Sequence, residues 1–201
     1  MSKGEQTRQH ILGTALAMAR ECGLEGLTIG SLAEGLSMSK SGVFAHFGSK
    51  EELQIAVLKE AAERFADQVL RPALAAPRGL ARIRAILDHW LAYSVASGLP
   101  GGCLFIAAAA EFDDKPGPVR DFLQQQQGQW RQSLLKAIGM AVETGELPPE
   151  TDVEQFGFEM FALVLACHHD QRLLSQRNAV DRARTGFERL LDHPPVHLSR
   201  H

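Results

Sequence analysis

The stretch TIGSLAEGLSMSKSGVFAHFGSKEEL, residues 28–53, decides the fold that this sequence predicts. It holds two short helical patterns, one beginning after Thr28 and one after Ser39, because a hydroxyl at the N-cap can accept a hydrogen bond from a free amide of the first turn. The first pattern repeats apolar residues at helical spacing up to Leu36. The second runs through His46 and holds serine, glycine and alanine where a globular protein normally places leucine. It therefore predicts a helix with only one buried face.

A longer helix is expected on the N-terminal side of this stretch. Ile11, Ala15 and Ala19 recur every four residues and form one apolar stripe. The stripe ends at Gly23 and Gly26, residues that suit a helix C-cap and a turn.

A second long helix is expected on the C-terminal side. Ser49 and Glu52 form the sequence pattern of a capping box, in which each side chain satisfies an amide of the first turn. The pattern predicts a helix from Lys50 to about Leu70 that stops before Pro72.

The rest of the chain also reads as helix, because valine and isoleucine lack the alternation of strands and no Asn-Gly or Asp-Gly hairpin turn occurs. Pro- and Gly-containing breaks separate the expected helices. These helices cover about residues 78–95, 102–111, 117–144, 152–176 and 179–191. The sequence thus predicts an all-α fold.

Composition is that of an ordinary globular protein of 201 residues with a net charge of −3. The first 50 residues hold five lysines and arginines and four glutamates, which gives +1, whereas the remainder has −4. The three cysteines show no metal-binding or disulfide spacing, and the longest apolar run, residues 103–110, is far shorter than a membrane helix. With no exported leader visible, we expect a cytoplasmic protein that does not contact a membrane.

Two short helices joined by a tight turn are the arrangement with which many proteins place a second helix in the major groove of DNA. Gly42 and Ala45 would let the backbone of this helix approach the groove, while Val43 and Phe47 would point inward. The polar side chains left for DNA are Lys40, Ser41 and His46. The alternative is that the three helices merely pack together and bind no nucleic acid.

Residues 7–55 closely resemble the DNA-binding region of the TetR family of bacterial transcriptional regulators. The likeness lies in a Thr-hydrophobic start, Ser-Lys in the turn, a closing aromatic-x-His-Phe, and Ser-Lys-Glu-Glu-Leu. The resemblance implies a non-enzymatic regulator without a cofactor, most often a repressor. It implies an N-terminal helix-turn-helix domain (1–49), joined by a long helix to a helical ligand-binding and dimerisation domain (50–192). A disordered tail (193–201) is expected to follow.

The family's DNA contacts can be carried over residue by residue. Its phosphate contacts correspond to Thr28, Lys40, His46 and Lys50. Its base-reading positions correspond to Ser39, Ser41, Gly42 and Ala45. This chain departs from the family pattern at two positions: Phe44 lacks the phenol hydroxyl that usually stands there, and Ser37 stands where glycine is common and would adopt a left-handed conformation at some cost.

A single short recognition helix gives little affinity, so a homodimer on a palindromic operator is expected. The last two helices carry apolar residues at spacings of three and four and are the expected interface. The candidates are Phe158, Phe161, Leu165, Arg172, Val180, Ala183, Phe187, Leu190 and Leu191. The alternative is that these residues pack only within their own chain.

The helix over residues 156–174 is apolar nearly all round, which predicts that it is covered on two sides. With the TetR resemblance, one side is expected to line a cavity for a small, largely apolar effector that releases DNA. The candidates are Trp90, Tyr93, Phe105, Trp130, Met140, Met160, Val164, Cys167 and His168. The alternative is that they form ordinary core.

Two other functions remain open from the sequence. An all-helical metal-binding protein or enzyme would use His168, His169 and Asp170 with Glu159, but adjacent helical residues point about 100° apart and chelate poorly together, so no metal site is expected. A scaffold that has lost operator binding is the other possibility, supported by Phe44 and the low positive charge.

Overall fold

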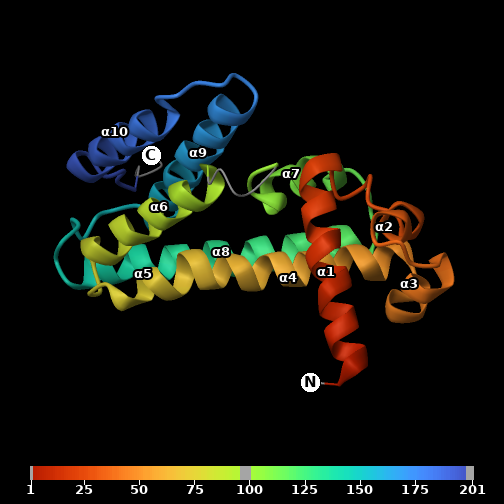
Figure 1. Ribbon diagram of the computed structural model, residues 1–201. Coiled ribbons are helices and arrows are strands. Elements are labelled where there is room, and N and C mark those ends of the chain that lie inside the picture. The colour runs from red at the N-terminus through yellow and green to blue at the C-terminus, as the bar shows by residue number, and fades with distance from the viewer. Residues whose placement is uncertain (1, 96–100, 198–201) are drawn as a thin grey trace. The chain divides into compact units, whose positions relative to one another are not determined.

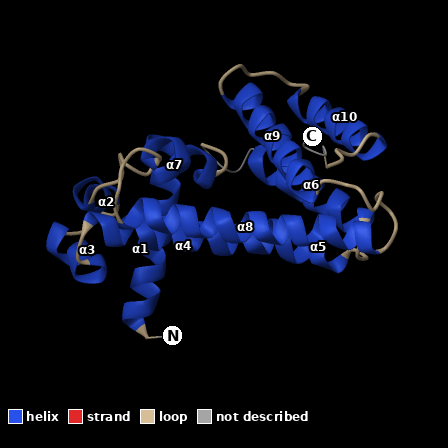
Figure 2. Ribbon diagram, turned by 180° about the vertical axis from the view of Figure 1, so that it is seen from behind, coloured by secondary structure: helices blue, strands red, loops and turns tan. Residues whose placement is uncertain are grey.

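The computed structural model describes residues 2–95 and 101–197. Within them the regular elements are helices, apart from one isolated bridge between Thr151 and Val196 (Figures 1 and 2). The predicted all-α fold is confirmed. In chain order the elements are α1 (Lys3–Cys22), α2 (Ile29–Gly35), α3 (Lys40–Phe47), α4 (Lys50–Phe65), the π-helix η1 (Ala66–Leu70), α5 (Arg71–Ala75), α6 (Leu80–Val95), α7 (Leu104–Phe112), α8 (Pro118–Glu143), α9 (Val153–Arg172) and α10 (Ala179–Asp192).

A hydroxyl side chain caps the N-terminus of each of the three helices that follow α1, as the sequence predicts. The Thr28 side chain accepts a hydrogen bond from the amide of Ser31 at 3.0 Å, and Ser39 accepts one from the amide of Gly42 at 3.1 Å. Ser49 caps α4 in the same way at 3.0 Å. Each hydroxyl satisfies an amide that has no partner inside its helix, which fixes where the helix starts.

The turn between α2 and α3 contains the expected left-handed residue. Ser37 has φ of 53°, and the next amide, that of Met38, donates to the Ala33 carbonyl at 2.9 Å. This bond satisfies a free carbonyl at the end of α2, so the helix closes and the chain turns directly into α3.

The described residues form two compact units, of which the first combines residues 2–64 with 101–127. Its core brings together buried side chains of α1, α2, α3, α4, α7 and the start of α8. Leu53 and Val57 of α4 are fully buried in this core. Helices α4 and α7 therefore share one core with the helix-turn-helix. The domain boundary expected after residue 49 stays a prediction.

The second unit combines residues 65–95 with 128–197. Here α9 and α10 lie side by side (Figure 1). Phe156 of α9 meets Phe187 of α10 edge to face, with 6.4 Å between ring centres. Both rings are buried, so this contact joins the two helices.

The expected end of the long helix before Pro72 is wrong. Helical structure continues from Lys50 through Ala75, because the π-helix η1 changes the hydrogen-bond register just ahead of the proline. The amide of Arg71 donates to the carbonyl of Ala66, five residues back. Pro72 then falls in the first turn of α5, where its missing amide costs little.

Residues beyond α10 contact the loop that precedes α9. Residues 195–197 run beside the loop between α8 and α9, where the Asp152 amide donates to the Pro195 carbonyl at 2.7 Å. The His197 ring lies 3.2 Å from the Asp152 carboxylate. The expectation of a disordered tail over residues 193–201 stays a prediction, and residues 198–201 lie outside the described residues.

Candidate nucleic-acid interface

The inner side of α3 is fixed by two buried side chains. Val43 has no exposed surface and Phe47 is 4% exposed, and both belong to the core that α1, α2 and α4 also enter. The prediction that these two residues point inward is confirmed. Because residues four apart share one face of a helix, the other face of α3 is left outside the core.

The outer face of α3 is the surface available to a partner. Its exposed residues are Lys40, Ser41, Phe44 and Ala45. Gly42 and His46 are half-buried at its edges. Apart from Phe44, which is 54% exposed, this face is polar or small, so another surface can approach the helix backbone closely.

Hydrogen bonds at the start of α3 order two of the predicted base-reading residues. The Ser39 hydroxyl, besides capping the helix, lies 3.1 Å from the Ser41 hydroxyl. The contact holds the two hydroxyl groups together at the exposed beginning of α3. In helix-turn-helix proteins this end of the second helix is the part that contacts base edges.

Two of the predicted phosphate contacts lie close together at the start of α2. A Cβ on Gly30 would lie 3.7 Å from both the Lys40 ammonium and the Thr28 hydroxyl, and 3.4 Å from Cε of Lys40. The lysine side chain therefore lies over the small residue Gly30. A methyl group at residue 30 would be in ordinary van der Waals contact with the lysine side chain.

Lys50, another predicted phosphate contact, also makes a hydrogen bond within the protein. Its ammonium donates to the Glu25 carbonyl at 2.7 Å, which ties the start of α4 to the loop between α1 and α2. An ammonium has three N–H groups. Two of them stay available to an anion.

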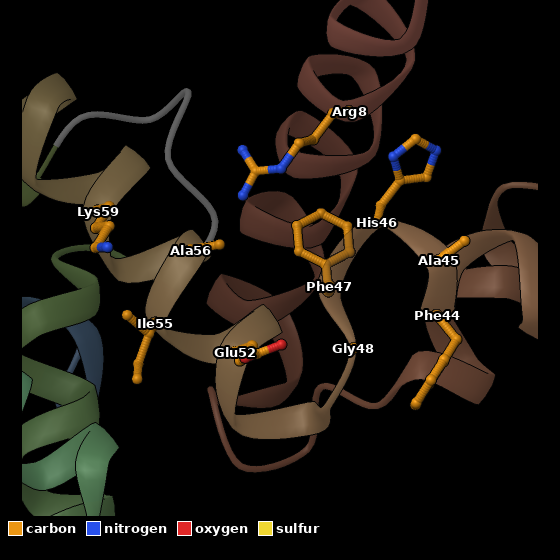
Figure 3. Close-up of a pocket in the computed structure, with 10 residues that line it drawn as sticks. All are labelled: Arg8, Phe44, Ala45, His46, Phe47, Gly48, Glu52, Ile55, Ala56 and Lys59. Atoms are coloured by element: carbon orange, nitrogen blue, oxygen red, sulfur yellow. The ribbon is translucent and has the colours of Figure 1, made fainter.

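A groove of about 620 Å³ lies beside α3, between α1 and α4 (Figure 3). Arg8 from α1, His46 from α3 and Lys59 from α4 face it together with the single carboxylate of Glu52. The Arg8 guanidinium stands over the Phe47 ring, 5.1 Å from its centre. The groove is therefore cationic on balance and continues from the outer face of α3.

Sequence reasoning missed Arg8. The guanidinium is held by a cation–π contact to a ring that is itself buried, so its position depends on the packing of α1 against α3. One signal was available: Arg8 precedes Ile11 and Leu12 by three and four residues, which places it on the buried stripe of α1.

Three of the nine predicted effector contacts meet in one aromatic cluster of the second unit. Trp90 and Trp130 lie edge to face at 4.9 Å, and the Phe65 ring contacts Trp130 at 4.9 Å and Tyr93 at 5.4 Å. Met160, Val164 and Cys167 are buried along α9, and Met140 and His168 are half-buried. Phe105 does not join them, since it packs against the core of the first unit.

The predicted dimer residues separate into two groups. Ala183, Phe187 and Leu190 are at most 5% exposed in the single chain, so they offer almost no surface to a second copy and instead hold α10 against its own unit. Phe161 contacts Trp90 at 5.5 Å and joins the aromatic cluster. The residues left with free surface are Phe158, Leu165, Arg172, Val180 and Leu191.

The metal-binding alternative rests on His168, His169 and Asp170 of α9. His169 Nδ1 lies 3.2 Å from the carboxylate of its neighbour Asp170. Across residues 2–95 and 101–197, no three His, Cys, Asp or Glu side chains come together as a metal site would require. Over the same residues, no helix is long and apolar enough to span a membrane.

A three-helix module whose last helix is capped, anchored inward and polar outward defines a helix-turn-helix protein. Comparison with known families agrees: residues 11–57 match "Bacterial regulatory proteins, tetR family", and residues 79–187 match "Tetracyclin repressor-like, C-terminal domain". The chain belongs to the TetR family of transcriptional regulators, a family without enzymatic activity. Members of this family bind operator DNA and small effectors.

Individual relatives support the same assignment. The repressor AcnR of Corynebacterium efficiens is 40% identical over 67 residues, which are 33% of this chain and 36% of AcnR. The chain thus matches only about a third of the length of this relative. A TetR regulator from Chloroflexus aurantiacus is 25% identical, with a TM-score of 0.87 over 99% of this chain and 100% of its own. AibR, solved with isovaleryl coenzyme A and operator DNA, shares the fold at 22% identity, with a TM-score of 0.75 over 93% and 98% of the two chains.

Proposed function

We propose that this protein is a ligand-responsive repressor that binds a palindromic operator as a homodimer and is released by a small, largely apolar effector. The observation that carries the proposal is the outer face of α3, where Lys40, Ser41 and Ala45 are exposed on a helix anchored by buried Val43 and Phe47. Of the four side chains predicted to contact phosphate, Thr28, Lys40 and Lys50 are exposed in the same unit, and His46 is half-buried.

A second copy is required by the size of this surface. One eight-residue helix covers only part of one major-groove face, and two copies about 34 Å apart reach successive faces of the duplex. Phe158 and Leu165, seven residues apart on α9, are 54% and 38% exposed. They lie on one face of the helix and are the apolar surface that we assign to the dimer.

Footprinting of the purified protein on DNA that flanks its own gene tests the proposal. A protected palindrome with half-sites one helical turn apart is the expected result. A folded protein that protects no segment, even among duplexes selected from a random library, would contradict the proposal.

The aromatic cluster supports the chemistry assigned to the effector. Phe65, Trp90, Tyr93, Trp130 and Phe161 supply ring surface. The Trp130 indole N–H is buried and finds no hydrogen-bond acceptor among the described residues. A buried donor of this kind favours a ligand with one acceptor atom on an otherwise apolar body.

Release of labelled operator, followed by fluorescence anisotropy, tests this chemistry with defined probes. Acetophenone represents an apolar ring with one carbonyl, choline an organic cation, and isovaleryl coenzyme A the ligand solved with AibR. We expect acetophenone to quench tryptophan fluorescence and to release DNA, and Trp130→Phe to weaken both effects. Release by choline alone would replace the apolar effector by a cationic one.

A further inference from the structure

The short segment between α1 and α2 is held by a carboxylate from a distant part of the sequence. Glu111, near the end of α7, accepts hydrogen bonds from two consecutive amides, that of Leu24 at 3.2 Å and that of Glu25 at 2.7 Å. One carboxylate oxygen faces each amide. The Leu24 side chain is fully buried, so this backbone is fixed within the first unit.

The carbonyls of the same two residues are held by α4. The Gln54 side-chain amide donates to the Leu24 carbonyl at 2.8 Å, and Gln54 is only 2% exposed. The Lys50 ammonium donates to the Glu25 carbonyl at 2.7 Å. The segment 24–25 therefore lies between α7, which binds its amides, and α4, which binds its carbonyls.

An ion pair and a close approach to a glycine also connect this segment with α7 and the residues just after it. Lys115, just beyond α7, pairs with the Glu25 carboxylate, and its hydrogen bond lowers the pKa of that group. Gly23 has φ of 82°, and a Cβ there would lie 3.0 Å from a Glu111 oxygen. The carboxylate thus approaches the backbone at a point where a side chain would be in its way.

We propose that Glu111 is a positioning residue through which α7 sets the orientation of α2 and α3, and hence the affinity for DNA. The segment it holds leads directly into α2, and α2 leads into α3, so a shift of this segment moves the outer face of α3. Hydrogen bonds to a charged acceptor are roughly twice as strong as neutral ones, which suits the role. The inference rests on the proposed function and assigns a mechanism to it.

The connection joins the two parts of the sequence that the family comparison distinguishes. Leu24 and Glu25 lie in the span matched by the N-terminal family, and Glu111 in the span matched by the C-terminal family. A change in α7 would reach the DNA-binding helices through two hydrogen bonds to the backbone. Glu111 itself touches none of the predicted DNA contacts.

A substitution that removes the charge of Glu111 changes the affinity for DNA in opposite directions under the two explanations, positioning and simple electrostatics. Glu111→Gln removes one negative charge, which by Coulomb attraction alone strengthens DNA binding slightly. It also places a donor against one of the two amides, so positioning predicts weaker binding, by about tenfold. Asp114→Asn is the matched control, since it removes the same charge from an exposed side chain three residues away.

The experiment measures the affinity of the full-length variants for the footprinted duplex, and the backbone hydrogen exchange of residues 23–36 and 39–48 without DNA. We expect Glu111→Gln to bind more weakly and to exchange about tenfold faster in both segments. Asp114→Asn should match the unsubstituted protein in both readouts. The slope of log K against log salt should stay unchanged in Glu111→Gln, because no phosphate contact is lost.

Unchanged exchange across residues 39–48 in Glu111→Gln would overturn the inference, as would an affinity equal to that of Asp114→Asn. If the unsubstituted protein binds no DNA, the proposed function fails, and the exchange measurement alone then decides whether Glu111 positions α3. If Glu111→Gln does not fold, Glu111→Asp replaces it. That variant keeps the charge but is one methylene shorter, and we expect it to bind DNA more weakly and to exchange faster than Asp114→Asn; equality with Asp114→Asn in both readouts would overturn the inference.

Discussion

Helices α3 and α9 differ in the kind of side chain that they expose to solvent. Both bury one apolar side: Val43 and Phe47 for α3, and a longer row that includes Met160 and Val164 for α9. The exposed side of α3 is small and polar, whereas that of α9 includes Phe158, 54% exposed. A polar face with little bulk suits the groove of DNA, and a second apolar face needs a protein surface to cover it. The exposed side, more than the buried one, indicates the partner.

The strongest test of this difference between α3 and α9 is to make the exposed side of α9 polar. Phe158→Glu with Leu165→Glu should leave the fold intact but dissociate the proposed dimer. Each buried side chain contributes about 1.5–3 kcal/mol, and the symmetric interface holds both of them twice, so the dissociation constant should rise at least about a thousandfold. Analytical ultracentrifugation measures the change. A dimer of unchanged stability would place the interface elsewhere.

A substitution on the buried side of α3 should have the next largest effect, on the stability of the fold. Phe47→Ala should lower the free energy of unfolding by about 3–5 kcal/mol, because it leaves a cavity in the core. It also removes the ring on which Arg8 stands. Urea denaturation measures the loss, with Phe44→Ala as the control on the outer face, where less than about 0.5 kcal/mol is expected. Equal losses in the two variants would show that α3 is not anchored as described.

Lys40 tests whether the outer face of α3 meets phosphate. Lys40→Ala should flatten the slope of log K against log salt by about 2 for a dimer, and the double variant with Lys50→Ala by up to about 4, at roughly 0.9 for each lost phosphate contact. Lys136→Ala removes an exposed charge from α8 and should leave the slope unchanged. If all three slopes equal that of the unsubstituted protein, neither lysine contacts phosphate.

The features that could be predicted from the sequence depend on contacts between residues close together in the chain. The caps of Thr28, Ser39 and Ser49 each bind an amide three residues ahead. The left-handed Ser37 and the inward Val43 follow from turn geometry and helical period. Such contacts are the same wherever the helices finally pack, and the sequence pattern therefore identifies them.

The features that were missed depend on packing between distant segments. Glu111 lies 87 residues from Leu24, and Glu111 alone reads as a solvated acidic residue near a helix end. Phe161 has the spacing of an interface residue, yet it turns to Trp90. Helical periodicity gives the face on which a side chain lies, but it does not show which neighbour covers that face.

The smallest expected effect concerns the buried side of α9, where Cys167 is 2% exposed. Burial raises the pKa of its thiol, and burial likewise raises that of Cys103 in the first unit. A raised pKa leaves less thiolate at neutral pH, and thiolate is the reactive form. With Ellman's reagent we expect one thiol per chain, the exposed Cys22, to react in the native protein and all three after denaturation. Rapid reaction of Cys167 in the native protein, identified by mass spectrometry, would show that this side of α9 opens to solvent. The two sides of α9 would then differ less in solvent exposure than described.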